Sequence, residues 1–514
     1  MRRLLGIVLM ALLVVPVAGV ARADVKLPGI FGDHAVLQRE LAVPVWGWAD
    51  PGEKVTVSFA GQQKTATADA SGKWSLKLDP LAAGGPYDLK VQGKNTLTRI
   101  DLLVGEVWLC SGQSNMGMTV GGVQDKEREI AEADFPKIRM ASPAHTPLPE
   151  PVNDTTVSWA ICSPKTVAGF SAAAYFFGRD LHRDLSVPVG LINSSWGGTP
   201  IQAWTSLPAQ KAVPELAPIA ENYLKAVVSY DPDKAQQQYQ KQLAGWEKAR
   251  AKAKADQKPF TSRKPQTPMR PEKSPNSAAT LYNGMIVPLV PYAIRGAIWY
   301  QGESNAGNAK IYAAQMRALI ANWRKDWNEG DFPFLFVQLP NFMAAQTKPS
   351  ESVGGWPLIR EQFVKTLEVP NTGMAVTIDI GEADNIHPRD KQDVGKRLEQ
   401  WALAKVYGKN VTACGPLYKS MRKEGDKIVL EFDYAQDGLE VKGGGSLKGF
   451  AIAGSDKKFV WADAKIEGQT VVVSAQGVSD PAAVRYAWAN NPACNLFNAA
   501  GLPASPFRTD NWAE

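Results

Sequence analysis

The sequence predicts an α/β protein with a mainly parallel sheet covered on both faces and a small β domain at each end of the chain. Residues 101–410 alternate strand-like apolar runs with helix-like segments, and the long crossovers call for parallel pairing. The strand runs are almost wholly apolar, as expected where both faces of a sheet are buried. Residues 24–100 and 411–514 instead hold short segments between turn sequences, which is typical of small sandwiches.

Residues 1–23 are expected to be a secretion signal and not part of the fold. Two arginines precede an apolar run over residues 4–20, and Ala-Arg-Ala at 21–23 has the small-x-small form of a signal-peptidase site. The run is shorter than the roughly 20 apolar residues that span a bilayer. We therefore expect a mature chain from Asp24, periplasmic or secreted, with no membrane attachment after cleavage.

The charge balance argues against one class of partner. The chain has 57 basic and 51 acidic residues, and cleavage after residue 23 would leave 54 and 51. This gives no electrostatic case for nucleic acid. The four cysteines lack metal-site spacing. An oxidising compartment would allow disulfides, and Cys414 with Cys494 is the favoured pair because both lie in the C-terminal third.

The N-terminal β domain, residues 24–100, is predicted from short runs separated by turn sequences such as Asp-Pro-Gly. The expected strands are 43–48, 54–59, 63–68, 73–78 and 87–91. Trp46 or Trp48 could bind carbohydrate there, although a core role is commoner for such residues.

From residue 101 the expected elements alternate between strand and helix. The first strand, residues 107–110, breaks at Ser111-Gly112 and leads into a helical turn. The later strands are expected at 137–141, 189–193, 296–300, 334–339 and 374–380, and the helices at 171–185, 309–327, 358–367 and 391–407.

A basic insertion interrupts this plan at about 205–280. Within it, residues 234–273 carry eleven basic and three acidic side chains. The first half has helical composition, and the proline-rich second half is expected to be a loop. Attraction of an anionic glycan is one interpretation, but a solvated helix and loop is favoured. Residues 411–514 then return to short strands, at 427–432, 447–452, 465–467, 470–474 and 483–487.

Ser114 is the candidate nucleophile. It follows the first strand of the α/β region at the edge where open α/β sheets place their ligands, and local N–H groups with a helix dipole can stabilise an anion there. A serine hydroxyl needs a base. His387 is the favoured base because it lies between a predicted strand and a predicted helix, on the same edge. His34, His145 and His182 fall in the β domain, a proline-rich loop and a helix, respectively.

Asp384 is the candidate carboxylate that orients the base. It precedes His387 by three residues, so one short loop can present both side chains. Asp379 and Glu382 are the fallback carboxylates. For the oxyanion of an acyl transfer, the candidates are backbone N–H groups in the Gly-rich stretch 193–199 and the Asn305 amide in stretch 301–305.

Four segments together resemble the sialate O-acetylesterase family of SGNH hydrolases. They are Gly112-Gln113-Ser114-Asn115-Met116, Trp196-Gly197-Gly198, Trp299-Tyr300-Gln301-Gly302-Glu303-Ser304-Asn305 and Ile386-His387-Pro388. The resemblance implies a flavodoxin-like three-layer α/β sandwich with flanking β domains. It also implies a serine esterase that removes acetyl groups from sugar hydroxyls, with no metal and no other cofactor.

The same resemblance implies roles for single residues. Ser114 would be the nucleophile, His387 the base and Asp384 its orienter. The oxyanion hole would be formed by the N–H of Ser114, a glycine N–H at Gly197 or Gly198, and Asn305. The remaining motif residues would contact substrate or support Asn305, and they are Gln113, Gln301 and Glu303.

We therefore expect hydrolysis of an O-acetylated glycan through an acetyl-serine intermediate, with no obligate protein partner. Sialate is the first substrate, and xylan or xyloglucan is the alternative. A sialate carboxylate should call for a basic residue in the cleft, for which the candidates are Arg295, Arg360, Arg389 and Arg485. A non-catalytic carbohydrate-binding protein is a remote alternative, because such relics usually lose the nucleophile or the base.

Overall fold

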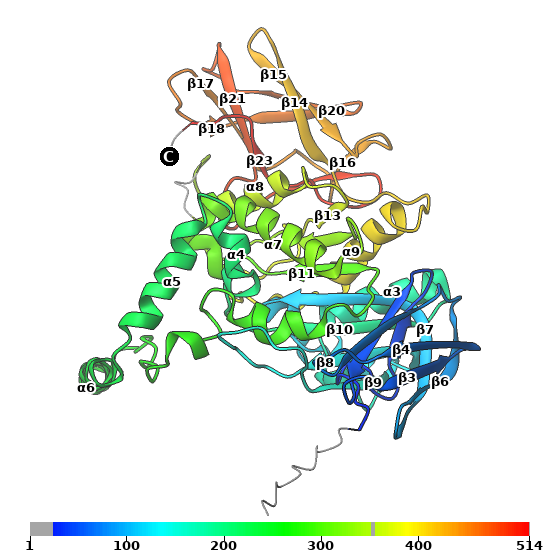
Figure 1. The fold of residues 1–514 in the computed structure, drawn as a ribbon. Coiled ribbons are helices and arrows are strands. Elements are labelled where there is room, and N and C mark those ends of the chain that lie inside the picture. Colours follow the sequence, from blue (N-terminus) through cyan, green and yellow to red (C-terminus); the bar gives the residue numbers. More distant parts are fainter. Residues whose placement is uncertain (1–23, 351–354, 513–514) are drawn as a thin grey trace, which may run out of the picture.

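The computed structural model describes residues 24–350 and 355–512. It shows a mixed α/β body with a large, mostly parallel central sheet, and smaller antiparallel sheets toward both chain ends (Figure 1). The expected secretion signal, residues 1–23, lies outside the described residues, so the structure leaves that prediction open.

The central sheet has the strand order β13-β12-β11-β7-β10-β8-β9. All of these pairs are parallel except β8 with β9. The chain order reverses at β7, which has β10 on one side and β11 on the other, and such a switch point is where open α/β sheets form a crevice. The strand bounds are β7 (Thr96–Gly112), β8 (Phe135–Pro143), β9 (Val157–Cys162), β10 (Val189–Ser195), β11 (Gly296–Tyr300), β12 (Phe334–Val337) and β13 (Thr372–Ala375).

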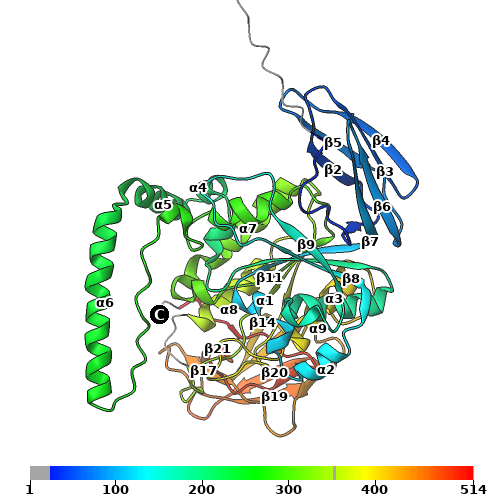
Figure 2. The same ribbon diagram turned by 90° about the horizontal axis from the view of Figure 1, so that it is seen from below.

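Helices cover both faces of this sheet, as its apolar strands predict (Figures 1 and 2). On one face, Trp108 of β7 packs edge-on against Phe177 of α3, with ring centroids 5.0 Å apart. On the other, Trp299 of β11 packs against Trp323 of α7 at 5.9 Å. Trp108 and Trp299 are both fully buried. The covering helices are α3 (Ala172–Leu185), α7 (Tyr312–Trp327), α8 (Trp356–Thr366) and α9 (Gln392–Lys405).

Strand β7 is much longer than the expected residues 107–110. It has 17 residues and pairs with β6 near its start and with β10 and β11 near its end. One continuous strand therefore joins the N-terminal sheets to the central sheet across residue 100. The other N-terminal strands are β1 (Val36–Gln38), β2 (Val43–Trp48), β3 (Lys54–Phe59), β4 (Gln62–Thr67), β5 (Lys73–Leu78) and β6 (Gly84–Gln92).

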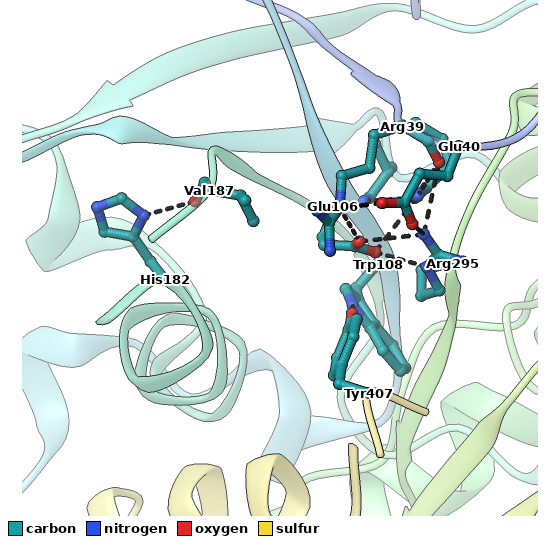
Figure 3. Close-up of polar contacts among 10 residues, drawn as sticks. Arg39, Glu40, Glu106, Trp108, His182, Val187, Arg295 and Tyr407 are labelled. Carbon is teal, nitrogen blue, oxygen red and sulfur yellow. Dashed lines mark hydrogen bonds and ion pairs between the residues drawn. The ribbon is translucent and has the colours of Figure 1, made fainter. Parts of the chain in front are cut away.

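A buried ion cluster lies where β7 enters the central sheet (Figure 3). Glu106 is fully buried and lies 2.5 Å from Arg39 Nε and 2.7 Å from Arg295 Nε. Burial opposes ionisation, yet the two guanidinium groups hold the pKa of Glu106 below its ordinary value. Arg295 is therefore bound to Glu106. Six residues separate Glu106 from Gly112 at the end of the strand, so Arg295 is held about 20 Å from that end.

The basic insertion forms an arm that stands away from the body (Figure 2). Its long helix α6 (Pro232–Ala255) has no buried residue, and the following segment to residue 270 has no regular structure. The insertion thus has a solvent-exposed helix followed by an irregular segment. The insertion also contains α5 (Ala217–Ser229) and α4 (Leu207–Lys211), and α4 packs against α7 of the body. No helix in the described ranges is long and apolar enough to cross a membrane.

The C-terminal part packs two four-stranded antiparallel sheets around one apolar core that includes Leu430, Val471, Ile452 and Val484. One sheet holds β14 (Leu417–Glu424), β15 (Lys427–Asp433), β20 (Thr470–Ser474) and β19 (Asp463–Glu467). The other holds β18 (Val460–Trp461), β17 (Phe450–Gly454), β21 (Pro481–Tyr486) and β23 (Phe507–Arg508). A two-stranded pair joins β16 (Leu439–Val441) to β22 (Leu496–Asn498).

The favoured disulfide between Cys414 and Cys494 is wrong for this structure, in which all four cysteines are free thiols. Cys414 Sγ points to the carbonyl oxygen of Gly415, at 3.1 Å, and Cys494 faces Tyr486 and Arg360 instead. Burial raises the pKa of both thiols. Shared location in the C-terminal third therefore did not bring the two side chains together.

Candidate functional site

Ser114 begins the short helix α1 (Ser114–Gly117), two residues after β7 ends. The turn needs glycine at position 112, where φ is +140° and an added Cβ would lie 2.1 Å from the carbonyl oxygen of Tyr300. The N–H of Gln113 donates to that same carbonyl at 3.0 Å. The turn is therefore fixed against the end of β11 and holds Ser114 at the switch point of the sheet.

His387 meets Ser114 directly: its Nε2 lies 2.8 Å from Ser114 Oγ. The histidine is half-buried in the loop between β13 and α9, where Asn385 Oδ1 accepts its backbone N–H at 3.0 Å. Burial and the neighbouring Lys391 ammonium lower the pKa of His387. The imidazole is therefore neutral at neutral pH and can accept a proton from the hydroxyl.

Asp384 does not join this pair in the structure. Its side chain is exposed and makes no hydrogen bond with His387 or with any other residue in the described part of the chain. The expected orientation of the imidazole by Asp384 is thus absent from this geometry.

The two fallback carboxylates bind other groups. Asp379 forms a paired contact with Arg397, at 2.6 and 2.8 Å. Glu382 accepts the backbone N–H and Nε of Arg389, at 2.8 and 3.0 Å. Within residues 24–350 and 355–512, no carboxylate is hydrogen-bonded to His387, and no group of three or more His, Cys, Asp or Glu side chains could hold a metal ion.

Backbone amides beside Ser114 can stabilise an anion. A Cβ added to Gly197 would lie 3.3 Å from Ser114 Cβ, so the Gly197 backbone lies against the hydroxyl-bearing residue. Neither the Gly197 N–H nor the Ser114 N–H donates to an acceptor among the described residues. Gly198 makes no comparable approach, since nothing lies within 4 Å of a Cβ built there. Ser114 and the glycine that packs against it thus each keep a backbone N–H without an acceptor among the described residues.

Asn305 has no amide hydrogen left for an oxyanion in this structure. Its Nδ2 donates to Gln202 Oε1 and Gln315 Oε1, both at 3.2 Å. Its Oδ1 accepts the N–H of Ile201 at 3.0 Å and Nε2 of Gln301 at 2.8 Å. The expected donor instead ties the loop after β10 to the loop after β11. Gln301 is fully buried, which fits support of Asn305 and not contact with a substrate.

Gln113 and Glu303 also point into the scaffold. Gln113 Oε1 accepts the backbone N–H of Ser304 at 3.3 Å. Glu303 Oε1 accepts Nδ2 of Asn115 at 2.5 Å, and burial raises the pKa of Glu303. Both side chains therefore hold the nucleophile turn against the start of the segment that follows β11.

Two residues at the site were missed by the sequence reasoning. Lys391 is fully buried, with Nζ 2.9 Å from Asn115 Oδ1. The ring of His145 stacks on Trp196 at 4.7 Å and 22°, next to Gly197. Lys391 lies four residues after His387, so sequence proximity was a signal for it, whereas His145 lies in a proline-rich loop far from the Gly-rich stretch in sequence. The sequence did not reveal the direction of either side chain.

The other histidines and the candidate arginines lie elsewhere, with one exception. His34 binds Asp101 at 2.7 Å. His182 Nδ1 meets the carbonyl oxygen of Val187 at 2.6 Å (Figure 3). Arg389, which is exposed, is the one candidate arginine in the loop of His387. The other three candidate arginines are bound elsewhere. Arg295 contacts Glu106, and Arg485 contacts Asp510. Arg360 donates to the carbonyl oxygens of residues 339, 340, 489 and 490.

Comparisons with known proteins match this chain to one group of enzymes. A family model described as carbohydrate esterase, sialic acid-specific acetylesterase, matches residues 104–257 and 273–404. The chain is 33% identical to sialate O-acetylesterase of Rattus norvegicus over 98% of both chains. It is 31% identical to that of Homo sapiens over 94% of this chain and 92% of the human one. A carbohydrate acetylesterase from Xanthomonas citri superposes with a TM-score of 0.80, at 37% identity, over 95% of this chain and 100% of that one.

Proposed function

The chain belongs to the sialic acid-specific acetylesterase family of carbohydrate esterases, and we propose that Ser114 and His387 perform its hydrolysis of sugar O-acetyl esters through an acetyl-serine intermediate. The observation that carries this proposal is the 2.8 Å contact between Ser114 Oγ and His387 Nε2 at the switch point of the sheet. The hydroxyl has a base within hydrogen-bond reach, which is the first requirement for nucleophilic catalysis.

In the first half-reaction, Ser114 Oγ attacks the acetyl carbonyl carbon while His387 Nε2 takes its proton. The carbonyl oxygen becomes an oxyanion, for which the N–H groups of Ser114 and Gly197 are the donors. Collapse of the tetrahedral intermediate expels the sugar oxygen, which leaves with the proton from His387. In the second half-reaction His387 activates water, which releases acetate and regenerates the serine.

We assign the central sheet to the SGNH-hydrolase class of α/β sandwich. The support is its strand order: numbered in chain order, the five strands β10-β7-β11-β12-β13 run 2-1-3-4-5, the flavodoxin-like order. The site lies at the switch point that this order predicts. Strands β8 and β9 extend the sheet beyond β10.

Export to the periplasm or the medium is part of the proposal. Its support is the apolar segment 4–20, followed by Ala-Arg-Ala at 21–23. The exported protein should begin at Asp24, which N-terminal sequencing checks. Exported material that still begins at Met1 would contradict cleavage.

We propose O-acetylated sialic acid as the substrate, with acetylated xylan or xyloglucan as the competing class. Arg389 is the candidate for the sialate carboxylate because it is exposed and lies two residues from His387. Its Nε is bound to Glu382 at 3.0 Å. A charge-assisted hydrogen bond from the Arg389 guanidinium to the sialate carboxylate would contribute about 1.5–3 kcal/mol to binding.

Arg389→Gln should raise KM for O-acetylated sialic acid by roughly tenfold or more, because that bond is lost. KM should stay unchanged for acetylated xyloglucan and for acetylated xylan free of uronic acid substituents, since these neutral polymers offer no carboxylate. Acetate release from each substrate, measured side by side, checks the expectation. Arg183→Gln, at an exposed position on α3, is the matched control. Equal losses on charged and neutral substrates would show that Arg389 supports the loop and does not read the carboxylate.

A further inference from the structure

Lys391 is a buried cation that the two half-reactions do not use. It is fully buried, and its ammonium group lies between the turn that carries Ser114 and the loop that carries His387. Nζ donates to Asn115 Oδ1 at 2.9 Å and to the carbonyl oxygen of Pro388 at 2.5 Å. One ammonium group thus joins the residue after the serine to the residue after the histidine.

Asn115 makes a second tether between the same two segments. Its Nδ2 donates to the carbonyl oxygen of Ile386 at 3.0 Å. The carbonyl groups on both sides of His387 are therefore held by the pair of Asn115 and Lys391. Such a paired hold restricts both the position and the rotation of the peptide units that carry the imidazole.

Burial lowers the pKa of Lys391 to about 7, and the nearby charge of Glu303 opposes that shift. Asn115 accepts from the lysine through Oδ1 and donates through Nδ2 to Glu303 Oε1 at 2.5 Å. Nζ also lies 5.3 Å from the centroid of the Tyr300 ring, within cation–π range. An unbalanced buried charge would be strongly destabilising, so a carboxylate and an aromatic face beside the ammonium account for its retention.

The position of Lys391 argues against a role in stabilising its own helix. It is the N-cap residue of α9, where Ser, Thr, Asp or Asn are preferred, and its side chain makes no capping bond. A cation at a helix N-terminus also opposes the helix dipole. The nearby cap is supplied by Asp390, whose Oδ1 accepts the N–H of Asp393 at 3.0 Å. The lysine therefore serves the contact with Asn115 and Pro388 at a cost to α9.

We propose that Lys391 is a positioning residue for the esterase, whose ammonium group locks the His387 loop onto Asn115 and so sets the distance from Ser114 Oγ to His387 Nε2. The proposal rests on the roles assigned above to Ser114 and His387. Beyond the effect of burial, the ammonium acts on the imidazole electrostatically and lowers the pKa of His387. The charged groups that act on the ammonium itself are Glu303, Asp390 and Glu382.

Lys391→Met keeps the length and apolar stem of the side chain but removes the ammonium. We expect kcat for an aryl acetate to fall about 10- to 100-fold per active site, counted by serine titration, because small misplacements of catalytic groups cost about this much. KM should change little. The acid limb of kcat/KM should move to higher pH, because the lysine lowers the pKa of His387 and its removal lets that pKa rise.

The matched control is Lys396→Met, which removes an exposed lysine from the same helix. It should leave kcat and the pH profile unchanged. A merely structural role for Lys391 would lower the fraction of active sites without moving the acid limb. Unchanged kcat per active site and an unmoved limb in Lys391→Met would overturn the proposal.

Asn115→Ala provides a second variant should Lys391→Met fail to fold. It removes both tethers but leaves the ammonium, so kcat should fall while the acid limb moves less than in Lys391→Met. Where both single variants fold, the double variant should lose little more than the larger single loss, because the two side chains act as a unit. Full additivity would overturn the shared clamp. These outcomes are separate from the nucleophile test, since an active Ser114→Ala would overturn the assigned catalytic roles themselves.

Discussion

Ser114→Ala is expected to lower kcat for an aryl acetate by at least about 10,000-fold, because removal of a nucleophile that acts with a base eliminates the covalent route. Oγ is the only non-hydrogen atom removed, and it lies 2.8 Å from His387 Nε2. Folding should be retained, since the turn is held by Gly112 and by the Gln113 N–H contact with Tyr300. Stopped-flow or long-time acetate release, with intact mass checked, gives the measurement.

Ser111→Ala is the matched control for this variant. Ser111 lies in the same stretch and is fully buried, and its Oγ has no hydrogen-bond partner among the described residues. Removing that hydroxyl should therefore leave both activity and stability close to those of the unaltered enzyme. If Ser114→Ala retained activity while Ser111→Ala lost it, the nucleophile would have been assigned to the wrong serine.

The meeting of Ser114 with His387 was predictable because both follow strands at the carboxyl edge of one sheet. The carboxyl ends of parallel strands share an edge, so two residues 273 positions apart were expected at the same rim. The α/β class was predictable for a related reason: strands that are apolar on both faces need helices on both faces. These inferences use only strand order and hydrophobic pattern, which the sequence carries directly.

The role of Asn305 was not predictable, because it depends on which way a side chain turns. The motif places Asn305 four residues after Gln301, but both amides point into a buried network with Gln202 and Gln315. Gln202 comes from the loop after β10, about 100 residues earlier, and its arrival beside Asn305 is a tertiary event. The burial of Lys391 was not predictable either, because a cation next to a helix N-terminus is unfavourable for the helix dipole.

Asp384 lies outside the contact between Ser114 and His387, so the two variants His387→Ala and Asp384→Asn should differ widely in activity. His387→Ala should lower kcat/KM by at least about 10,000-fold, because the serine then lacks its base. Asp384→Asn should lower it no more than about fivefold, the effect typical of an exposed charge worth up to about 1 kcal/mol. The contrast follows from geometry: His387 contacts Ser114 Oγ, whereas Asp384 is exposed and has no hydrogen bond to the imidazole.

Steady-state kcat/KM for the two variants on one aryl acetate provides the comparison. A carboxylate that orients a catalytic histidine is worth about 10,000-fold in turnover, so the two possibilities differ by more than a thousandfold. A small effect of Asp384→Asn would establish that Ser114 and His387 work as a dyad whose imidazole is held by its backbone tethers to Asn115 and Asn385. A loss near 10,000-fold would instead mean that Asp384 turns toward His387 when substrate binds, since catalytic hydrogen bonds often tighten only in the substrate complex.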